Sequence, residues 1–334
     1  MGIAGLRVGF CYGSDDLINE VQKLQGRGNS RIFKVVTNSA QVYVMKNYPD
    51  LLIDPRNRLQ TEVQSCRLLE EYHLTPKVVA YDVDLNIALF EWIDGETLQS
   101  VEDEHIDQAL DFIKKLQERE APDFSQSASE ACTSADQLFS QIEDRLQQLG
   151  TVKDEHLQQF LYAVFKPLFQ DVRKWSVQHW PTNNLRHKLP KTKQTLSPSD
   201  FGFHNSIMRG DGALCFLDLE YFGWDDPVKL IADFIWHPAM SLSEDHKKRW
   251  LENSFKIFND TEEIHQRFFA SWPLYGMRWA MILLNEFRKD GWGKRVHVNE
   301  QIEHQREQKL SKQIDKANAV CALIKFHQME CPYV

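Results

Sequence analysis

The pattern of apolar and polar residues changes in two early segments of the chain. β-Branched and aromatic residues dominate both Arg31 to Thr37 and Gln41 to Tyr48. Asn38 and Ser39, which favour turns, stand between them. The pattern predicts a β-hairpin.

The regions on either side of this hairpin carry helix signals. Ser14, followed by two aspartates, is typical of a helix start, and we expect that helix to end near Gly26. Between residues 57 and 72, apolar side chains recur at spacings of three and four, which is one face of an amphipathic helix: Leu59, Val63, Cys66, Leu69 and Tyr72. Two short strands are expected after it, at 78–83 and 87–93. Together these elements predict a small α+β lobe spanning residues 1–94.

The rest of the chain, residues 95–334, reads as mainly α-helical. Polar loops are expected near 122–134 and 181–193, and the helical spacing of apolar residues from Ile302 to Ile324 predicts a closing helix packed on the core. One segment breaks the helical pattern, because short apolar stretches flank Gly210, Asp211 and Gly212. We interpret it as a second β-hairpin. The fold class is therefore predicted as α+β with two lobes.

The second hairpin brings chemically useful side chains together. A turn centred on Asp211 would place Asn205 opposite Asp218, and Asp200 would arrive at the same end of the hairpin. A carboxylate beside an amide oxygen suits Mg²⁺, and a second carboxylate can accept the proton of an attacking hydroxyl. Glu220, on the same side of the chain as Asp218, could reach a second metal ion or the substrate. Taken alone, these residues could equally be turn and cap residues of an ordinary hairpin.

A lysine in the first lobe adds to this picture. Lys46 continues the row formed by Val42 and Val44 along one face of its strand, so we expect it to be partly buried. A buried lysine needs a partner, and Glu62, which borders the apolar stripe of the next helix, is the natural candidate. Each residue alone is more commonly a surface charge. In this order, upstream of Asp200, they favour a site that grips nucleotide phosphates.

The segment SDFGFHN, followed by FLDLE and WDDP, resembles the aminoglycoside phosphotransferase and choline kinase group of enzymes. Their pattern is HGDxxxxN, a hairpin, then DxE or DxD, then DP. The resemblance implies a two-lobed, protein-kinase-like fold, ATP and Mg²⁺ as cofactors, and a small hydroxyl-bearing acceptor. It also implies that Asp200 is the catalytic base and that Asn205 and Asp218 are magnesium ligands.

The resemblance has one clear departure. Pro198 and Ser199 stand where the family has His-Gly, and that histidine normally supports the loop without transferring the proton. The departure is the support for an alternative function, a pseudokinase that binds nucleotide without turnover. Asp233 matches a family position that we expect to be structural. A protein kinase is disfavoured, because no stretch resembles an activation loop that ends in APE.

Further residues enter the prediction by their place in the family pattern. Gly28, Asn29 and Ser30 match the nucleotide loop, whose backbone N–H groups would bind phosphates. Backbone groups of Glu91 and Ile93 would read the adenine edge. The region of the family's substrate helices holds four candidate acceptor contacts: Tyr275, Arg278, Glu286 and Asp290.

The composition of the chain indicates which classes of partner the protein can bind. The 334 residues include 48 acidic and 39 basic side chains, for a net charge of −9, which disfavours binding to nucleic acid or to anionic lipid. The six cysteines form no CxxC pair, so we expect reduced thiols in a cytoplasmic protein. No apolar run is long enough to span a membrane. A small molecule is the expected partner.

Overall fold

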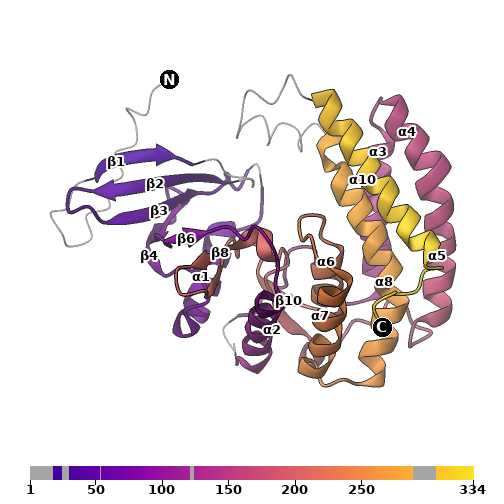
Figure 1. The fold of residues 1–334 in the computed structure, drawn as a ribbon. Coiled ribbons are helices and arrows are strands. Elements are labelled where there is room, and N and C mark those ends of the chain that lie inside the picture. The colour runs from indigo at the N-terminus through magenta and orange to yellow at the C-terminus, as the bar shows by residue number, and fades with distance from the viewer. Residues whose placement is uncertain (1–17, 25–29, 53, 121–123, 289–305) are drawn as a thin grey trace. The chain divides into compact units, whose positions relative to one another are not determined.

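The computed structural model describes residues 18–24, 30–52, 54–120, 124–288 and 306–334 (Figure 1). The chain divides into two compact units, Met1–Asp94 and Gly95–Val334. The first is rich in strands and the second in helices, so the α+β fold class predicted from the sequence is confirmed. Among the helices described, none is both long and apolar enough to cross a membrane.

The first unit is built on one antiparallel sheet with the strand order β1-β2-β3-β5-β4 (Figure 1). The predicted hairpin is present, and its register pairs Val35 with Tyr43 and Ile32 with Lys46. The strands are β1 (Ile18–Lys23), β2 (Arg31–Thr37), β3 (Val42–Asn47), β4 (Val78–Asp82) and β5 (Ile87–Glu91).

The helix expected after Ser14 is wrong where the structure describes the chain. Residues 18–23 form the edge strand β1, which pairs antiparallel with β2. Its sequence, INEVQK, is mostly polar because only one face of this edge strand meets the core, where Val21 packs beside the buried Val35, Met45 and Ile87. Backbone pairing with β2 outweighed a local preference for helix.

Helix α1 (Arg58–Leu68) follows β3 in the first unit. The Asn57 side chain caps its start by accepting a hydrogen bond from the Gln60 backbone N–H. The predicted apolar stripe is buried, with Leu59, Val63 and Cys66 each at most 3% exposed. A 3-10 turn, Glu70–Tyr72, continues the helix towards β4.

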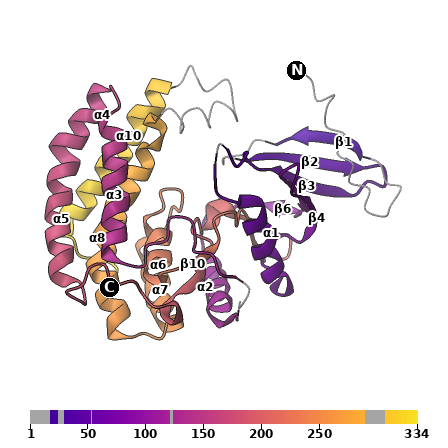
Figure 2. The ribbon, with the colours of Figure 1, turned by 180° about the vertical axis from the view of Figure 1, so that it is seen from behind.

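The second unit is mainly helical, as predicted. Helix α8 packs against α10, α5, α3 and α6, and Figures 1 and 2 show α3, α5, α8 and α10 side by side. The closing helix α10 is described from Arg306, so residues 302–305 of its predicted range lie outside the described part. The helices are α2 (Asp103–Glu118), α3 (Ala135–Gly150), α4 (Glu155–Phe160), α5 (Lys166–His179), α6 (Pro227–Trp236), α7 (Glu244–Ile257), α8 (Glu262–Leu283) and α10 (Arg306–Phe326).

Two small sheets complete the second unit. One has the order β6-β8-β9 and the other pairs β10 with β7. Gly95 begins β6 where a Cβ atom would lie 2.2 Å from the carbonyl oxygen of Met208, so only glycine allows this close pairing. The strands are β6 (Gly95–Glu96), β7 (Thr195–Ser197), β8 (Ser206–Arg209), β9 (Leu214–Phe216) and β10 (Gly223–Asp225).

Candidate active site

The predicted second hairpin is formed by β8 and β9. Ile207 pairs with Cys215, and Gly212 takes the left-handed backbone that the turn requires, with a φ of 86°. The Leu217 N–H donates to the Asn205 carbonyl at 2.8 Å, so Asn205 lies opposite Leu217. The expected partner, Asp218, is the next residue along the chain. The register was therefore predicted to within one residue, and Asp218 still follows directly at the end of the hairpin that holds Asn205.

Asp200 and Asn205 belong to one short loop between β7 and β8. The Asn205 side-chain amide donates to the Asp200 carbonyl at 3.0 Å. Because the nitrogen of that amide is used inside the loop, its oxygen, Oδ1, is the atom suited to a cation. The loop thereby joins the predicted base to a predicted magnesium ligand.

Two histidines contact the Asp200 carboxylate. Its Oδ1 lies 3.1 Å from Nε2 of His204 and 3.4 Å from Nε2 of His237. Burial raises the pKa of this carboxyl, but hydrogen bonds from His204 and His237 lower it more and hold it well below its usual range. Burial lowers the pKa of His237, which keeps that ring neutral at pH 7 and able to donate one N–H. Asp200 is thus an ionised, oriented carboxylate.

Asp200, His204 and His237 are also residue types that bind transition metals. The two imidazole rings stack with centroids 3.8 Å apart and planes 8° from parallel. A histidine nitrogen binds a metal with a lone pair that lies in the plane of its ring, so two parallel stacked rings cannot both aim at one ion. In this arrangement His204 Nε2 makes a hydrogen bond to Asp200 Oδ1, and the His237 ring stacks on His204 with its Nε2 near the same oxygen.

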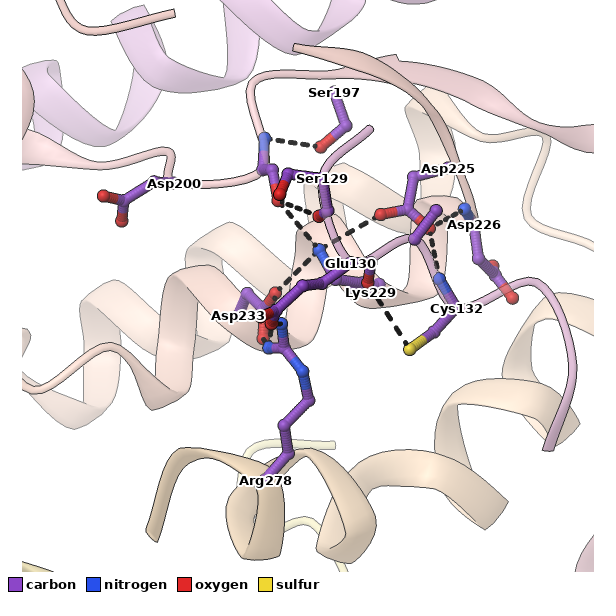
Figure 3. Close-up of polar contacts among 12 residues, drawn as sticks. Ser129, Glu130, Cys132, Ser197, Asp200, Asp225, Asp226, Lys229, Asp233 and Arg278 are labelled. Carbon is purple, nitrogen blue, oxygen red and sulfur yellow. Dashed lines mark hydrogen bonds and ion pairs between the residues drawn. The ribbon is translucent and has the colours of Figure 1, made fainter. Parts of the chain in front are cut away.

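The loop in front of Asp200 rests on buried polar groups. Ser199 donates from its hydroxyl to the Ser129 carbonyl at 2.9 Å and accepts from the Lys229 ammonium at 3.3 Å. Lys229 is fully buried and lies 3.1 Å from a carboxylate oxygen of Asp225 and 3.2 Å from one of Asp233. Figure 3 shows Lys229 within this cluster and the Asp200 carboxylate pointing away from it.

The Asp233 carboxylate contacts several side chains of this buried cluster in addition to Lys229. Its carboxylate accepts from Trp279 Nε1 at 2.8 Å and from the Arg278 guanidinium at 3.3 Å, in keeping with the structural role expected for it. Arg278 also donates to Glu130 at 2.8 Å, and Figure 3 shows both residues beside Asp233. Gln141 accepts from Arg278 at 3.0 Å. It is only 4% exposed.

Three of the four candidate acceptor contacts in the region of the substrate helices are buried, and their role in binding an acceptor stays a prediction. Arg278 donates its hydrogen bonds to protein side chains. Tyr275 and Glu286 are 2% and 6% exposed. Asp290, the fourth candidate, lies outside the described residues. Tyr275 and Arg278 pack within the helical unit, because this apolar stretch of α8 is buried on most of its surface.

The first unit contains the predicted lysine–glutamate pair. Lys46 Nζ lies 2.7 Å from Glu62 Oε2, and both residues are buried, at 6% and 5% exposed. The Tyr48 hydroxyl donates to the same carboxylate oxygen at 2.7 Å. Lys46 of β3 and Tyr48, just after that strand, therefore both contact one carboxylate of α1.

The remaining predicted nucleotide contacts are only partly described. Gly28 and Asn29 lie outside the described residues, and Ser30 is buried at 4% exposed. The Glu91 N–H donates to the Lys77 carbonyl at 3.0 Å, so that group belongs to the sheet. Ile93 is buried at 8% exposed.

Asp218 and Glu220 follow the hairpin in the second unit. Asp218 is half-buried with a left-handed backbone, φ 63°, and Glu220 is 4% exposed. Carboxylate oxygens of this kind, with the amide oxygen of Asn205, are the hard donors that Mg²⁺ prefers. The donor chemistry of these residues fits that ion.

The sequence analysis missed the residues that hold the loop, namely His204, His237 and Lys229. A signal for Lys229 was present in the sequence. The lysine interrupts the apolar helix PVKLIADFIW and has aspartates four residues before and four residues after it. A charge inside an apolar helix, flanked at this spacing by opposite charges, indicates a buried ion pair.

Comparison with proteins of known structure shows the same fold. The choline kinase LicA from Streptococcus pneumoniae is 14% identical with a TM-score of 0.57, over 92% of this chain and 94% of that one. Aminoglycoside phosphotransferase APH(4)-Ia, in a ternary complex with AMP-PNP and hygromycin B, is 16% identical with a TM-score of 0.56, over 93% and 95%. An ethanolamine kinase from Plasmodium vivax is 16% identical with a TM-score of 0.52, over 84% and 81%. The two-lobed, kinase-like fold predicted from the sequence is confirmed.

Comparison of sequences gives the family. No curated protein matches the chain significantly. The profile of the phosphotransferase enzyme family matches residues 20–267, which is well over half of the chain and includes both Lys46 and the Asp200 loop. The protein is therefore an enzyme of the phosphotransferase class, and it belongs to the phosphotransferase enzyme family.

Proposed function

We propose that the protein is an ATP- and Mg²⁺-dependent kinase that phosphorylates a hydroxyl group of a small molecule. The observation that carries the proposal is the loop from Asp200 to Asn205, which holds an ionised carboxylate and a metal-ligand amide five residues apart, next to Asp218. The structural relatives are described as choline, ethanolamine and aminoglycoside kinases, so we infer an amino alcohol, an aminoglycoside or a similar small metabolite as acceptor.

Asp200 acts as the base in this proposal. Its carboxylate stays ionised at neutral pH and is held by His204, so it can orient the acceptor hydroxyl and take its proton as the bond to phosphorus forms. A carboxylate of low pKa is a weak base, which suits a reaction in which the proton leaves late and positioning matters most.

Asn205 and Asp218 would hold Mg²⁺, with Glu220 as a further carboxylate nearby. When bound, the ion neutralises charge on the nucleotide phosphates. Lys46, held by Glu62 at 2.7 Å, would bind the α- and β-phosphates. For adenine, the Glu91 N–H is engaged in the sheet, so the proposal relies on the Glu91 carbonyl and the Ile93 backbone. Contacts of Gly28, Asn29 and Ser30 with the phosphates stay predictions. A cytoplasmic location, inferred from scattered cysteines with no CxxC pair, also stays a prediction.

The test is a screen for ADP release over amino alcohols, sugars, aminoglycosides and nucleosides. Asp200→Asn is expected to lower kcat by about 10²- to 10⁴-fold, while stabilisation of the protein by Mg·ATP is unchanged. Asp211→Asn is the matched control, because it makes the same change at the exposed tip of the hairpin that follows the Asp200 loop. Equal turnover by Asp200→Asn and the wild type would refute the assignment.

The alternative is a pseudokinase, and the same screen separates it from the enzyme. It would show stabilisation by Mg·ATP with no ADP released from any acceptor. Its support was the missing His-Gly before Asp200. The hydrogen bonds made by Ser199 weaken that support, because they offer the loop another anchor.

A further inference from the structure

Helix α6 and the residues just after it contact the Asp200 loop at three places. The Lys229 ammonium donates to Ser199 Oγ at 3.3 Å, His237 Nε2 lies 3.4 Å from the Asp200 carboxylate, and the Phe203 N–H points to the sulfur of Met240 at 3.2 Å. The contacts occur in the same order along both segments. The loop is therefore held by helix α6 at one point and by the residues after that helix at two more.

Ser199 has an unusual backbone for its residue type. Its φ is 67°, in the left-handed region that glycine enters freely and other residues enter at a cost of about 1–2 kcal/mol. In the family pattern this position, directly before the aspartate, is glycine. The serine keeps the glycine-like backbone and adds a hydroxyl, which donates to the Ser129 carbonyl and accepts from Lys229. The added hydroxyl links the loop to the core, which a glycine cannot do.

Lys229 is suited to be a fixed support. An ammonium group has three N–H donors, and Lys229 has three acceptors within 3.3 Å, on Asp225, Asp233 and Ser199. The two aspartates are themselves held, Asp225 by the backbone N–H groups of Cys132 and Asp226, and Asp233 by Trp279. The ammonium is buried, so no water competes for these positions.

We propose that Lys229 is a positioning residue which, through the Ser199 hydroxyl, fixes the backbone in front of Asp200, and so replaces the loop support that the family's histidine supplies. This inference rests on the proposed function of Asp200. It accounts for Pro198 and Ser199 in place of His-Gly. The loop is now supported by Lys229 of helix α6, which contacts Ser199, the residue directly before the base.

Ser199→Ala is the decisive variant, because it removes the link and leaves the Lys229 ion pairs in place. We expect kcat to fall by roughly tenfold or more, since small displacements of a reacting group slow catalysis strongly. The KM for ATP should stay within about twofold, because Ser199 has no proposed contact with nucleotide. Amide hydrogen exchange should speed up in peptides covering residues 197–205 and stay unchanged in α8. Ser176→Ala is the control, since it deletes a buried hydroxyl in α5 that has no hydrogen-bond partner in the part of the chain described.

A second arm tests the lysine itself. Lys229→Met and the double variant with Ser199→Ala should have the same kcat, because the lysine acts through the serine; independent effects would multiply. If Lys229→Met does not fold, Ser199→Ala still decides. Wild-type kcat and wild-type loop exchange in Ser199→Ala would overturn the proposal. A wild-type protein that releases no ADP with any acceptor would instead refute the kinase function, and loop exchange would still report on the support.

Discussion

The buried Lys46–Glu62 pair allows a quantitative prediction about the first unit. At a separation of 2.7 Å and an effective dielectric of about 20, the attraction is about 6 kcal/mol. Much of it offsets the cost of removing both charges from water, yet deleting one member of such a pair still costs about 3–5 kcal/mol, because the other charge stays buried. Total stabilities of domains are only about 5–15 kcal/mol. Lys46→Met should therefore remove a large part of the stability of this unit.

A second substitution separates stability from activity. Adding Glu62→Gln to Lys46→Met removes the stranded charge and keeps an acceptor for the Tyr48 hydroxyl. The double variant should recover at least about 2 kcal/mol of the lost stability. It should not recover activity, since the lysine proposed to bind the phosphates is still absent, and its KM for ATP should stay high.

Amide hydrogen exchange of peptides from β3 and α1 measures the opening free energy of this region directly. Turnover assays on the wild type, Lys46→Met and the double variant give kcat and KM. A double variant no more stable than Lys46→Met would show that the charge argument fails. Recovery of ATP affinity in the double variant would refute the role given to Lys46.

Three further predictions concern the second unit. Burial raises the pKa of the Glu130 carboxyl, but the guanidinium groups of Arg278 and Arg145 lower it more, to about 2, below the usual 4.5. The ionised carboxylate therefore stabilises the fold fully above pH 4.5, and this stabilisation fades as the pH falls towards 2. Glu130→Gln should lower the free energy of unfolding by about 1 kcal/mol at pH 7, a small value because the side chain is 41% exposed, and should not change it near pH 2. Urea unfolding at both pH values would measure the difference. Arg278→Met should lower the free energy of unfolding by about 3 kcal/mol. Arg278→Lys should not restore it, because an ammonium cannot reproduce the contacts of the planar guanidinium with Asp233, Glu130 and Gln141. A lysine variant as stable as the wild type would contradict this. Burial raises the pKa of three thiols to about 12, those of Cys132, Cys321 and Cys331. These thiols should resist iodoacetamide at pH 8 until the protein unfolds. Fast labelling of any of them in the native protein, mapped by mass spectrometry, would contradict this prediction.

The sequence predicted those elements whose periodicity and packing agree. Strand β2 was placed at its observed bounds, and the stripe of α1 is buried as its spacing required. The contact between Lys46 and Glu62 was also predicted, because a lysine in an apolar row needs a partner and the next helix offers one carboxylate beside its apolar stripe. Where local pattern and tertiary packing coincide, the sequence is sufficient.

Strand β1 and the support of the Asp200 loop could not be predicted in the same way. The polar sequence of β1 is compatible with a helix, and only pairing with β2, which is a tertiary event, makes it a strand. Lys229 and His237 contact a loop that lies 30 and 37 residues earlier, at Ser199 and Asp200, and no local spacing encodes such contacts. The flanking aspartates indicate that Lys229 is paired, but they do not point to Ser199.

The left-handed backbone at Ser199 costs strain that the contacts of its hydroxyl offset. Glycine would relieve about 1 kcal/mol of strain there, but it would also remove two hydrogen bonds worth about 1 kcal/mol each. If the hydroxyl fixes the base, Ser199→Gly would yield a slower enzyme that is no more stable. An evolving lineage under selection for turnover would keep the serine despite its strain, or would return to glycine only after acquiring another anchor for the loop.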